Sequence, residues 1–548
     1  MSSNFEFLLP EFRDLAEPAG RAERLVMQDP RAAGFYARFA LEASVLWLYK
    51  HDAGLRMPYD QSLGALLHEP TFQSRVPEAI FQKARVIQQA GNQAVHHQRP
   101  VRQFDALQVI KELHHVLYWL ARTYTRQGAG SKPPVAFDPQ LVPPAQTGAT
   151  PLDRKRLAEL ETELEAKART LVERDQRLTT LDEELKQLRA DLAAARAANE
   201  KLPDPHDYSE AETRTLLIDL ELKRAGWPLD QPRDREYEVT GMPNTSGRGF
   251  VDDVLWGDDG KPLGIVESKK TTADARVGQQ QAKLYADCLE AMTGQRPVIF
   301  YTNGYDTWIW DDVFYPPRKA LGFYKKEELQ RLIQRRKTRK PLGTTALSTT
   351  IIERYYQRRA IGCLGEVFTQ GRRKSLLVMA TGSGKTRTVI ALVDLLQRAN
   401  WVKRVLFLAD RVSLVNQAAG AFKKFLPDSS PVNLVTEKDK EGRVYVCTYP
   451  TMMGLIDKAN NGEAAFSVGY FDLIVIDEAH RSIYQKYRAI FAYFDSLLVG
   501  LTATPREEVD RNTYDLFDLE PGVPTDAYEL EKAVLDGFLV PPRVEQVD

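Results

Sequence analysis

The chain has 548 residues, too many for one hydrophobic core, and this length predicts three or four domains. Its net charge of −1 excludes a generally basic nucleic-acid coat, so any DNA contact must come from local clusters of Lys and Arg. Its cysteines are isolated, which excludes a disulfide framework and a thiolate metal site. With no secretory signal pattern and no apolar run of about 20 residues, we expect a cytoplasmic protein that does not cross a membrane.

Residues 1–127 predict a small α-helical domain. Ala32–Lys50 and Leu107–Tyr124 carry apolar residues at helical spacing, and no strand-like alternation accompanies them. Residues 128–152 are rich in Pro, Gly and small side chains and predict a linker.

Residues 153–200 carry a heptad pattern that predicts a long coiled-coil helix. Leucine recurs every seventh residue, at Leu157, Leu164, Leu171, Leu178, Leu185 and Leu192. Lys167 and Arg174 interrupt the seam, so a long symmetric dimer would be weakened. We therefore expect the helix either to pair in this weakened form or to pack on another part of the protein or on a partner subunit.

Residues 206–315 mix helix and strand. Ser209 and Glu212 form a capping-box pattern that predicts a helix through about Ala225. Three short strands are expected at Val251–Trp256, Leu263–Ser268 and Pro297–Thr302. Asn303-Gly304 predicts a two-residue hairpin turn after the third of these strands.

Residues 316–350 predict a connector with one helix and a basic run. That run, Arg335, Arg336, Lys337, Arg339 and Lys340, is interpreted as a solvated linker face, with a DNA backbone contact as the alternative. From about 351 to 548, strands and helices alternate, which predicts a parallel α/β sheet. The expected strands are Ser375–Met379, Val405–Ala409, Val444–Thr448, Leu473–Ile476 and Leu497–Leu501.

A phosphate-binding loop is predicted where the first of these strands runs into a helix. The loop residues Thr381, Gly382, Ser383 and Gly384 let the backbone close around a phosphate, and amides at the helix start point at it. Lys385 supplies a charge for the β- and γ-phosphates of ATP, and the Thr386 hydroxyl can coordinate Mg²⁺.

A second pair of acids completes this predicted ATP site. Asp477 and Glu478 follow the buried strand Leu473–Ile476, at the carboxyl edge where parallel sheets bind ligands. Asp477 is expected to hold Mg²⁺ through water, and Glu478 to orient or activate the attacking water.

A second metal-dependent site is predicted on the strands around residues 250–269. Glu267 and Lys269 fall on one strand face because side chains alternate, and an Asp of the neighbouring strand can converge on them. Two carboxylates suit Mg²⁺, which polarises a phosphate and activates water. Asp252 and Asp253 are both candidates for the second ligand. Lys269 is expected to position the water or to stabilise developing charge.

The ATP-site residues resemble those of superfamily II helicases. ATGSGKT at 380–386 and the DEAH box at 477–480 are similar to the two Walker motifs of that superfamily, which implies a RecA-like parallel α/β lobe. Further matches follow in order: Tyr356-Gln357 resembles the motif whose glutamine reads adenine, Ala409–Arg411 with Asn416-Gln417 resembles motif Ia, Cys447–Tyr449 resembles a strand-end motif, and Leu501–Pro505 resembles motif III.

The second site resembles the D…ExK core of restriction-endonuclease-like nucleases. Gln281 and Tyr285, four residues apart on one predicted helical face, are similar to the QxxxY motif attached to this core and are carried over as catalytic residues. The family pattern favours Asp252 over Asp253 as metal ligand, and Glu212 is a further acidic candidate. The resemblance implies a restriction-endonuclease-like α/β core.

Together, the nuclease core and helicase lobe resemble the restriction (R) subunit of type I restriction–modification enzymes over residues 206–548. The helical domain, with its Gly91–His97 signature, is similar to the front end of one subgroup. The resemblance implies an ATP- and Mg²⁺-dependent endonuclease and translocase that cuts unmodified double-stranded DNA. It also implies modification (methyltransferase) and specificity subunits as partners, which would read the DNA sequence. The chain stops before a second helicase lobe, so weak ATP hydrolysis is expected of it alone.

Two alternatives remain open at this stage. One is a stand-alone helicase–nuclease in repair or phage defence, and the other is a non-catalytic DNA-binding or scaffold module, which two intact polar constellations disfavour. His96, His97, His114 and His115 are interpreted as structural or surface histidines, because no Cys or acidic ligand pattern accompanies them.

Overall fold

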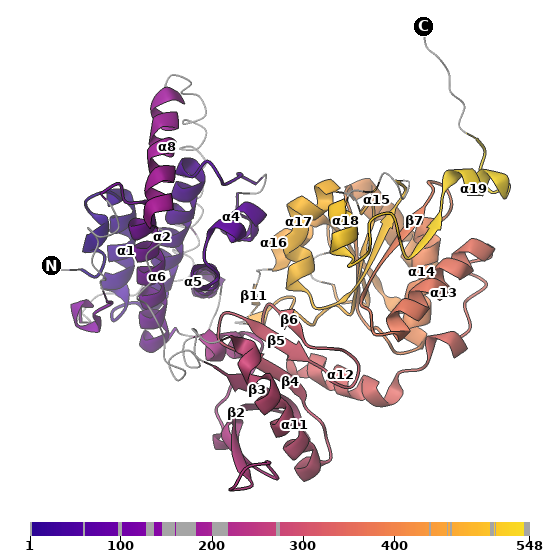
Figure 1. Cartoon of the computed structure of the whole chain (residues 1–548), viewed down its shortest axis with the longest axis horizontal. Helices are drawn as coiled ribbons and strands as arrows, with labels where there is room; N and C mark the ends of the chain where they lie inside the picture. The colour runs from indigo at the N-terminus through magenta and orange to yellow at the C-terminus, as the bar shows by residue number, and fades with distance from the viewer. Residues whose placement is uncertain are drawn as a thin grey trace.

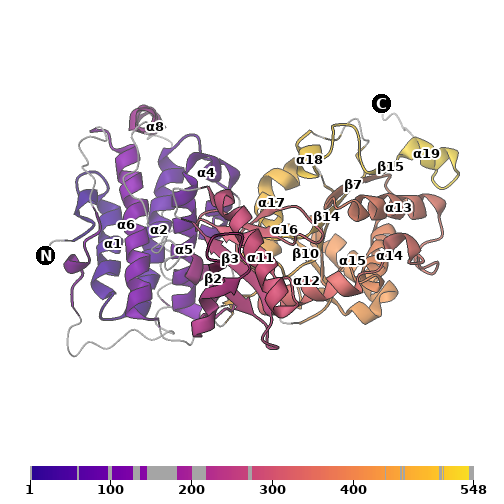
Figure 2. The ribbon, with the colours of Figure 1, turned by 60° about the horizontal axis from the view of Figure 1, so that its bottom comes forward.

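The computed structural model describes residues 3–58, 61–96, 101–127, 136–144, 159, 182–199, 217–269, 274–437, 440–456, 459–460, 463–479, 481–504, 509 and 511–541. Three bodies follow one another along the chain: a helical domain, a domain built on a six-stranded sheet, and a domain built on a seven-stranded parallel sheet (Figure 1). Figure 2 shows the six-stranded domain between the other two. Among the described helices, none combines the length and apolarity needed to span a membrane.

The helical domain is an α-helical bundle whose longest members are the two helices expected from periodicity. They are α2 (Pro30–His51) and α6 (Gln103–Tyr124). Asp29 caps α2 by accepting a hydrogen bond from the Ala32 amide at 3.0 Å, and Pro30 supplies its first turn. Around them pack η1 (Glu6–Leu8), α1 (Arg13–Leu25), α3 (Leu63–His68), α4 (Pro70–Arg75) and α5 (Glu78–His96). A single apolar core unites them.

The end of the predicted coiled-coil segment packs against this bundle as α8 (Asp182–Asn199), which stands beside α6 in Figure 1. Leu192 is buried in the bundle core, and Arg196 Nη1 donates to Asp52 Oδ2 at 2.7 Å. Asn199 Nδ2 donates to the Thr123 carbonyl at 3.1 Å. This packing corresponds to the second of the two arrangements expected. Most of the heptad run, and Lys167 and Arg174 with it, lies outside the described residues.

The six-stranded sheet has the order β1-β2-β3-β4-β5-β6. Its strands are β1 (Arg235–Thr240), β2 (Arg248–Trp256), β3 (Pro262–Ser268), β4 (Val298–Thr302), β5 (Thr307–Trp310) and β6 (Arg318–Ala320). Only β3 and β4 pair in parallel, because η7 (Ala275–Gly278) and α11 (Gln279–Thr293) form the crossover between them. α11 contacts β3 and β4, and α12 (Lys326–Thr338) also contacts β3. Before the sheet come α10 (Asp219–Arg224) and η6 (Pro232–Asp234).

The predicted two-residue turn at Asn303-Gly304 is wrong. Thr302 pairs with Thr307, so four residues connect β4 to β5. Asn303 Oδ1 accepts hydrogen bonds from the amides of Tyr305 at 3.0 Å and Asp306 at 2.7 Å. The asparagine side chain therefore closes a longer turn of its own, in place of the tight hairpin.

The seven-stranded sheet has the order β15-β7-β14-β13-β8-β10-β9, and all its pairings are parallel. The five predicted strands are confirmed as β7 (Lys374–Met379), β8 (Val405–Ala409), β10 (Val444–Thr448), β13 (Leu473–Ile476) and β14 (Leu497–Thr502). The edge strands β9 (Pro431–Asn433) and β15 (Asp526–Tyr528) were not predicted.

The helices of the seven-stranded domain are α13 (Tyr355–Thr369), α14 (Lys385–Arg398), α15 (Val412–Phe425), α16 (Tyr449–Ile456), α17 (Arg481–Tyr493), α18 (Arg511–Leu516) and α19 (Leu530–Leu535). The short turns η3 (Pro139–Leu141), η8 (Leu342–Thr344) and η9 (Pro427–Ser429) and the strands β11 (Ala459–Asn460) and β12 (Glu463–Ala464) complete the described elements.

Both interpretations of the basic run fail for three of its members. Arg335 is buried and donates to Asp472 Oδ1 and Oδ2 at 2.7 and 2.8 Å. Arg336 Nη2 donates to Asp311 Oδ1 at 2.7 Å, and the Arg339 guanidinium lies 3.0 Å from the centroid of the Trp401 ring. Arg335 and Arg339 tie the end of α12 to the seven-stranded domain and Arg336 ties it to the six-stranded one, so these three are neither a solvated face nor a DNA contact. Lys337 and Lys340 are exposed.

Candidate functional site

The predicted phosphate-binding loop lies between the carboxyl end of β7 and the first residue of α14. Gly382 and Gly384 have φ angles of 82° and 91°, a left-handed backbone that favours glycine. The Ser383 amide and hydroxyl both donate to the Ala380 carbonyl, at 3.1 and 2.6 Å, which closes the turn. Thr381 is exposed and Thr386 half-buried in the first turn of α14. This is the strand–loop–helix geometry that a phosphate cradle requires.

The predicted acidic pair meets Lys385 at this loop. Lys385 Nζ donates to Glu478 Oε1 at 3.1 Å, although the two residues lie 93 positions apart. Burial, with the neighbouring Glu478 carboxylate, raises the pKa of Asp477, and Lys385 opposes the shift. A partly buried carboxylate beside another acid is a donor set that a hard divalent cation fits.

The backbone at this acidic pair is clamped on both sides. The Asp477 amide donates to the Leu408 carbonyl at 2.9 Å, and the Ala479 amide donates to the Leu501 carbonyl at 2.7 Å. Between them Glu478 has a φ of 54°, in the left-handed region that costs a non-glycine residue free energy. The neighbouring strands therefore impose the direction in which the Glu478 carboxylate leaves the chain.

Tyr356 and Gln357 contact the phosphate-binding loop from α13. Tyr356 OH donates to the Ser383 carbonyl at 2.6 Å, and Gln357 Nε2 lies 3.4 Å from that same carbonyl. The Tyr356 ring stacks on Tyr528 of β15 at a centroid distance of 3.7 Å. Gln357 thus braces the loop, and its adenine-reading role stays a prediction. Tyr528 was not anticipated, because a three-residue edge strand leaves little periodicity to detect.

The second predicted site lies on β2 and β3. Asp253 pairs with Val266 across these strands, so Asp252 lies opposite Glu267 and the two carboxylates share a face of the sheet. Asp252 Oδ2 also accepts a hydrogen bond from the Ser268 amide at 2.7 Å. Asp253 is fully buried and, by alternation, belongs to the opposite face. The structure therefore brings Asp252, and not Asp253, next to Glu267.

A chain of hydrogen bonds leads from Glu267 to helix α11. Lys269 Nζ donates to Glu267 Oε1 at 2.8 Å and to Gln281 Oε1 at 3.3 Å. Gln281 Nε2 in turn donates to Tyr285 OH at 2.7 Å. Burial raises the pKa of Tyr285, the Gln281 hydrogen bond opposes this, and Glu267 adds to the rise. The hydroxyl of Tyr285 therefore keeps its proton at neutral pH.

Two glycines let α11 approach this site. A Cβ atom on Gly278 would lie 3.1 Å from Glu267 Cγ, and one on Gly249 would lie 2.7 Å from Tyr285 Cε1. The contact at Gly249 is one that real Cβ atoms essentially never show, so a side chain there would displace Tyr285, and a side chain at Gly278 would press on Glu267. The sequence did not reveal these two positions, because the spatial neighbours of a glycine are known only once the fold is known.

The fit of a divalent cation to the second site depends on Asp252 and Glu267. Both supply the oxygen atoms that Mg²⁺ prefers, and Glu267 is only 2% exposed. Within the described ranges, no group of three or more His, Cys, Asp or Glu side chains is arranged to hold a metal ion. The donor set is therefore a carboxylate pair, which fits Mg²⁺ completed by water or phosphate oxygens.

The two constellations lie on different domains and do not meet. Asp252, Glu267, Lys269, Gln281 and Tyr285 belong to the six-stranded domain, and the ATP-site residues belong to the seven-stranded one. Glu212, His480 and Pro505 lie outside the described residues, as do His97 and the side chain of His96. His114 and His115 are buried in the helical domain, where His114 contacts the rings of Phe7 and Tyr118. Both therefore lie in the packed interior of the bundle, which fits their interpretation as structural residues.

The comparisons with known proteins first define a class. Residues 350–507 match the family model "Type III restriction enzyme, res subunit", and residues 20–174 match a domain of unknown function, DUF4145. The first match covers the phosphate-binding loop, the acidic pair and Thr502. It makes the seven-stranded domain similar to the res subunit of type III restriction enzymes.

Particular relatives are the endonuclease subunits of type I restriction enzymes. The EcoAI subunit of Escherichia coli is 32% identical in an alignment of 378 residues, which covers 62% of this chain and 44% of that protein. The EcoKI subunit of E. coli K12 is 28% identical, over 61% of this chain and 35% of that protein. A solved fragment of an HsdR subunit from Vibrio vulnificus YJ016 is 27% identical, covers 60% of this chain and 61% of that chain, and has a TM-score of 0.28.

These matches show an HsdR-like chain, similar to the endonuclease (R) subunits of type I restriction enzymes. The resemblance predicted from the motifs is thereby confirmed. The chain spans less than half the length of the two curated relatives named above.

Proposed function

We propose that this chain supplies the nuclease and the ATP-driven motor of a type I restriction–modification enzyme. In this function it cuts unmodified foreign double-stranded DNA after ATP-driven translocation, in a complex with modification and specificity subunits. The observation that carries the proposal is the presence of both polar constellations in one HsdR-like chain, each with its charged side chains in contact.

The nuclease half of the proposal assigns each side chain of the second site a role. Asp252 and Glu267 would hold Mg²⁺, which supplies polarisation of the scissile phosphate and a more acidic bound water. Lys269, 2.8 Å from Glu267, orients the attacking water and offsets charge that develops on the phosphate. Gln281 fixes Lys269 from α11, and Tyr285 is held in turn by Gln281.

The motor half assigns ATP, as substrate, to the loop between β7 and α14. Backbone amides of Gly382 and Gly384 and of the first turn of α14 hold the phosphates, the Ser383 amide closes the loop through the Ala380 carbonyl, and Lys385 offsets the negative charge. Thr386 and Asp477 would hold the accompanying Mg²⁺. Glu478, whose direction is imposed by the clamped backbone, orients the water that attacks the γ-phosphate.

The matched variants Asp252→Asn and Asp253→Asn test the nuclease assignment. Each removes one charge from β2 with little change of shape, and the chain is assayed with co-purified modification and specificity subunits on unmodified plasmid. We expect Asp252→Asn to lower ATP-dependent cleavage at least 100-fold, the scale on which loss of a catalytic electrostatic group acts. Thermal melting of both variants controls for folding.

Loss of cleavage in Asp253→Asn alone, with its melting temperature unchanged, would contradict the assignment. Cleavage by the wild-type chain without any partner would instead favour a stand-alone helicase–nuclease. No cleavage by a folded wild-type complex on unmodified DNA would overturn the proposed function itself.

A further inference from the structure

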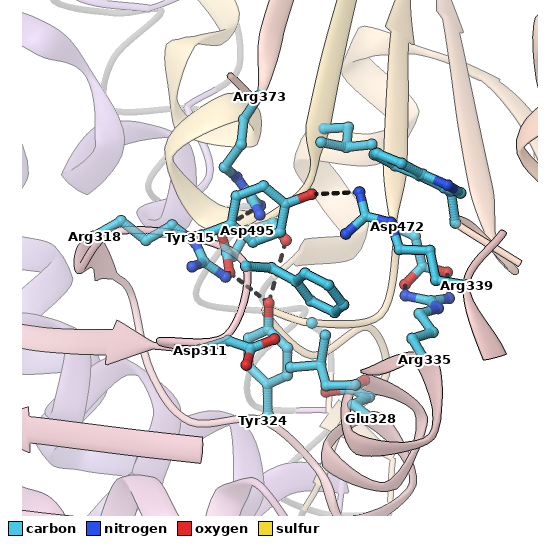
Figure 3. A pocket seen from close by; sticks show the side chains of 15 residues that line it. Asp311, Tyr315, Arg318, Tyr324, Glu328, Arg335, Arg339, Arg373, Asp472 and Asp495 are labelled. Atoms are coloured by element: carbon cyan, nitrogen blue, oxygen red, sulfur yellow. Dashed lines mark hydrogen bonds and ion pairs between the residues drawn. The ribbon is translucent and has the colours of Figure 1, made fainter. Parts of the chain in front are cut away.

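A small charged cavity of about 50 Å³ lies between the six-stranded and seven-stranded domains. Figure 3 shows side chains from both domains converging on it, with Asp495 facing Arg318, Arg373 and Tyr324. The cavity belongs to neither constellation described above. Two of the aspartates that line it, Asp472 and Asp495, belong to the seven-stranded domain, and each accepts hydrogen bonds from an arginine of the other domain.

The Asp495 carboxylate accepts hydrogen bonds from side chains of both domains. Its Oδ1 accepts from Arg318 Nε and from Arg373 Nη2, both at 2.7 Å. Its Oδ2 accepts from Arg318 Nη2 at 2.6 Å and from Tyr324 OH at 2.5 Å. Burial opposes ionisation, but Arg318 and Arg373 hold the pKa of Asp495 well below its usual range. Arg318 and Tyr324 belong to the six-stranded domain, so this carboxylate binds the two domains together.

Asp472 forms a second cross-domain contact. Arg335 of α12 donates to both of its carboxylate oxygens, in the bidentate geometry that is strongest for this pair. The amides of Lys403 and Arg404 also donate to Asp472 Oδ2, at 2.7 and 2.9 Å. Through Asp472, the Arg335 guanidinium is therefore held against the backbone that precedes β8 and β13 of the seven-stranded sheet.

These contacts lie at the amino ends of neighbouring strands of the seven-stranded sheet. Arg373, Asp472 and Asp495 lie directly before β7, directly before β13 and two residues before β14. These three strands are neighbours in the order β7-β14-β13. At their other ends follow the phosphate-binding loop, the Asp477–Glu478 pair and the segment after Thr502. One set of strands thus joins the candidate ATP site to the junction with the nuclease domain.

We propose that the Asp472–Asp495 junction makes the six-stranded domain and the motor sheet one cooperative unit, so that nucleotide bound to the motor stabilises the nuclease domain. The nucleotide part rests on the function proposed above. A ligand that binds only the folded state stabilises whatever unfolds together with its site. Without the junction, the six-stranded domain opens by itself as a smaller unit, and bound nucleotide no longer protects it.

Hydrogen exchange of the full chain tests the proposal at two places, the amides of β6 in the six-stranded domain and those of β14 in the motor sheet. In wild type, both sets should open with one shared dependence on denaturant. A non-hydrolysable ATP analogue with Mg²⁺, at about 100 times its Kd, should slow both by about 100-fold. In Asp495→Asn, β14 should keep the nucleotide effect, and β6 should exchange faster and respond less than 2-fold.

Two further variants keep the test sharp. Asp518→Asn is the matched control, because Asp518 pairs with Lys374 at 3.0 Å on an exposed part of the motor domain, and it should behave like wild type. Tyr324→Phe removes only the hydroxyl that donates to Asp495 Oδ2 and to the Asp495 carbonyl, so it decides the matter with an intermediate effect if Asp495→Asn does not fold.

Equal protection of β6 by nucleotide in wild type, Asp495→Asn and Tyr324→Phe would overturn the junction. So would separate opening of β6 and β14 in wild type. If wild type binds no nucleotide, the motor part of the proposed function fails, and the denaturant dependence alone still decides whether the junction couples the two domains.

Discussion

Gln281 is the side chain whose hydrogen bonds set the polarity of the candidate nuclease site. A lysine can only donate, so the Gln281 atom facing Lys269 must be the amide oxygen. The amide nitrogen then faces Tyr285, whose oxygen must accept. The Tyr285 proton is consequently directed away from Gln281 and stays available to another acceptor.

Gln281→Glu should reverse this polarity with almost no change of shape. A carboxylate accepts from both neighbours, so it would draw the Tyr285 proton toward itself. We expect single-turnover DNA cleavage to fall on the order of 100-fold, and Tyr285→Phe to add little when combined with it. Gln279→Glu, which adds the same charge two residues earlier on α11, is the control. Full additivity of the two changes would show that Gln281 and Tyr285 act independently.

The residues of both sites were accessible from sequence because their chemistry is local in the chain. Glu267 and Lys269 share a strand, Gln281 and Tyr285 share a helical face, and Lys385 follows its own loop. The choice between Asp252 and Asp253 was not accessible in this way. It depends on the register of β2 against β3, which sequence leaves open by one residue, and one residue moves a side chain to the other face.

Helix α8 illustrates how an element is held by a few polar anchors. Arg196 donates to Asp52 at 2.7 Å, and Tyr124 OH donates to the same carboxylate at 2.7 Å. Burial opposes ionisation of Asp52, but hydrogen bonds from Arg75 and Tyr124 lower its pKa to about 2. The Asp52 carboxylate is thus charged in the folded protein at neutral pH and can hold α8 by charge.

Arg196→Ala should loosen α8 from the helical bundle. Loss of one partner from a buried, hydrogen-bonded charge pair costs about 3 kcal/mol, although Arg75 still faces Asp52 and limits the effect. We expect amides of 188–199 to exchange about tenfold or more faster, with the amides of α2 and α6 nearly unchanged. Arg189→Ala, which removes only an exposed contact to the Lys50 carbonyl, should have a much smaller effect. Equal exchange in the two variants would contradict this account.

Strands were predictable where buried residues follow one another in the sequence. They were missed where pairing with a neighbouring strand determines whether they form. The predicted strands of the seven-stranded sheet are runs of buried residues, as a parallel sheet covered on both faces demands. β9 and β15 have three residues each and exist because β10 and β7 offer free edges. The interpretation of the basic run was wrong because the partners of its arginines are distant in the sequence, where no local pattern reveals them. These partners are Asp311, Asp472 and Trp401.

At the scale of the molecule, Glu328 makes the contact between the sheet domains depend on pH. It lies on α12, accepts a hydrogen bond from Ser467 of the seven-stranded domain, and is 1% exposed. Burial raises its pKa from 4.5 to about 7, although the Ser467 hydrogen bond opposes the rise. The folded protein therefore holds a proton that the unfolded chain releases.

Stability should consequently fall as pH rises from about 4.5 to 7, and level off above that. The full shift corresponds to about 3 kcal/mol. Glu328→Gln mimics the protonated carboxyl, so its unfolding free energy should lose this part of the pH dependence and exceed that of wild type at pH 8. Denaturant titrations of both proteins between pH 5 and 8 measure the difference. If the unfolding free energy of wild type changed with pH across this interval in the same way as that of Glu328→Gln, the assignment would be refuted.

The left-handed backbone of Glu478 has a consequence for the tolerance of the protein to change. A glycine there would relax a conformation that costs a side-chain-bearing residue roughly 1 kcal/mol or more. The same replacement would delete the acid that faces Lys385. Glycine at this position would therefore raise the free energy of unfolding and, on the proposed function, abolish ATP hydrolysis. A selection for thermostable variants would tend to recover inactive ones at this position.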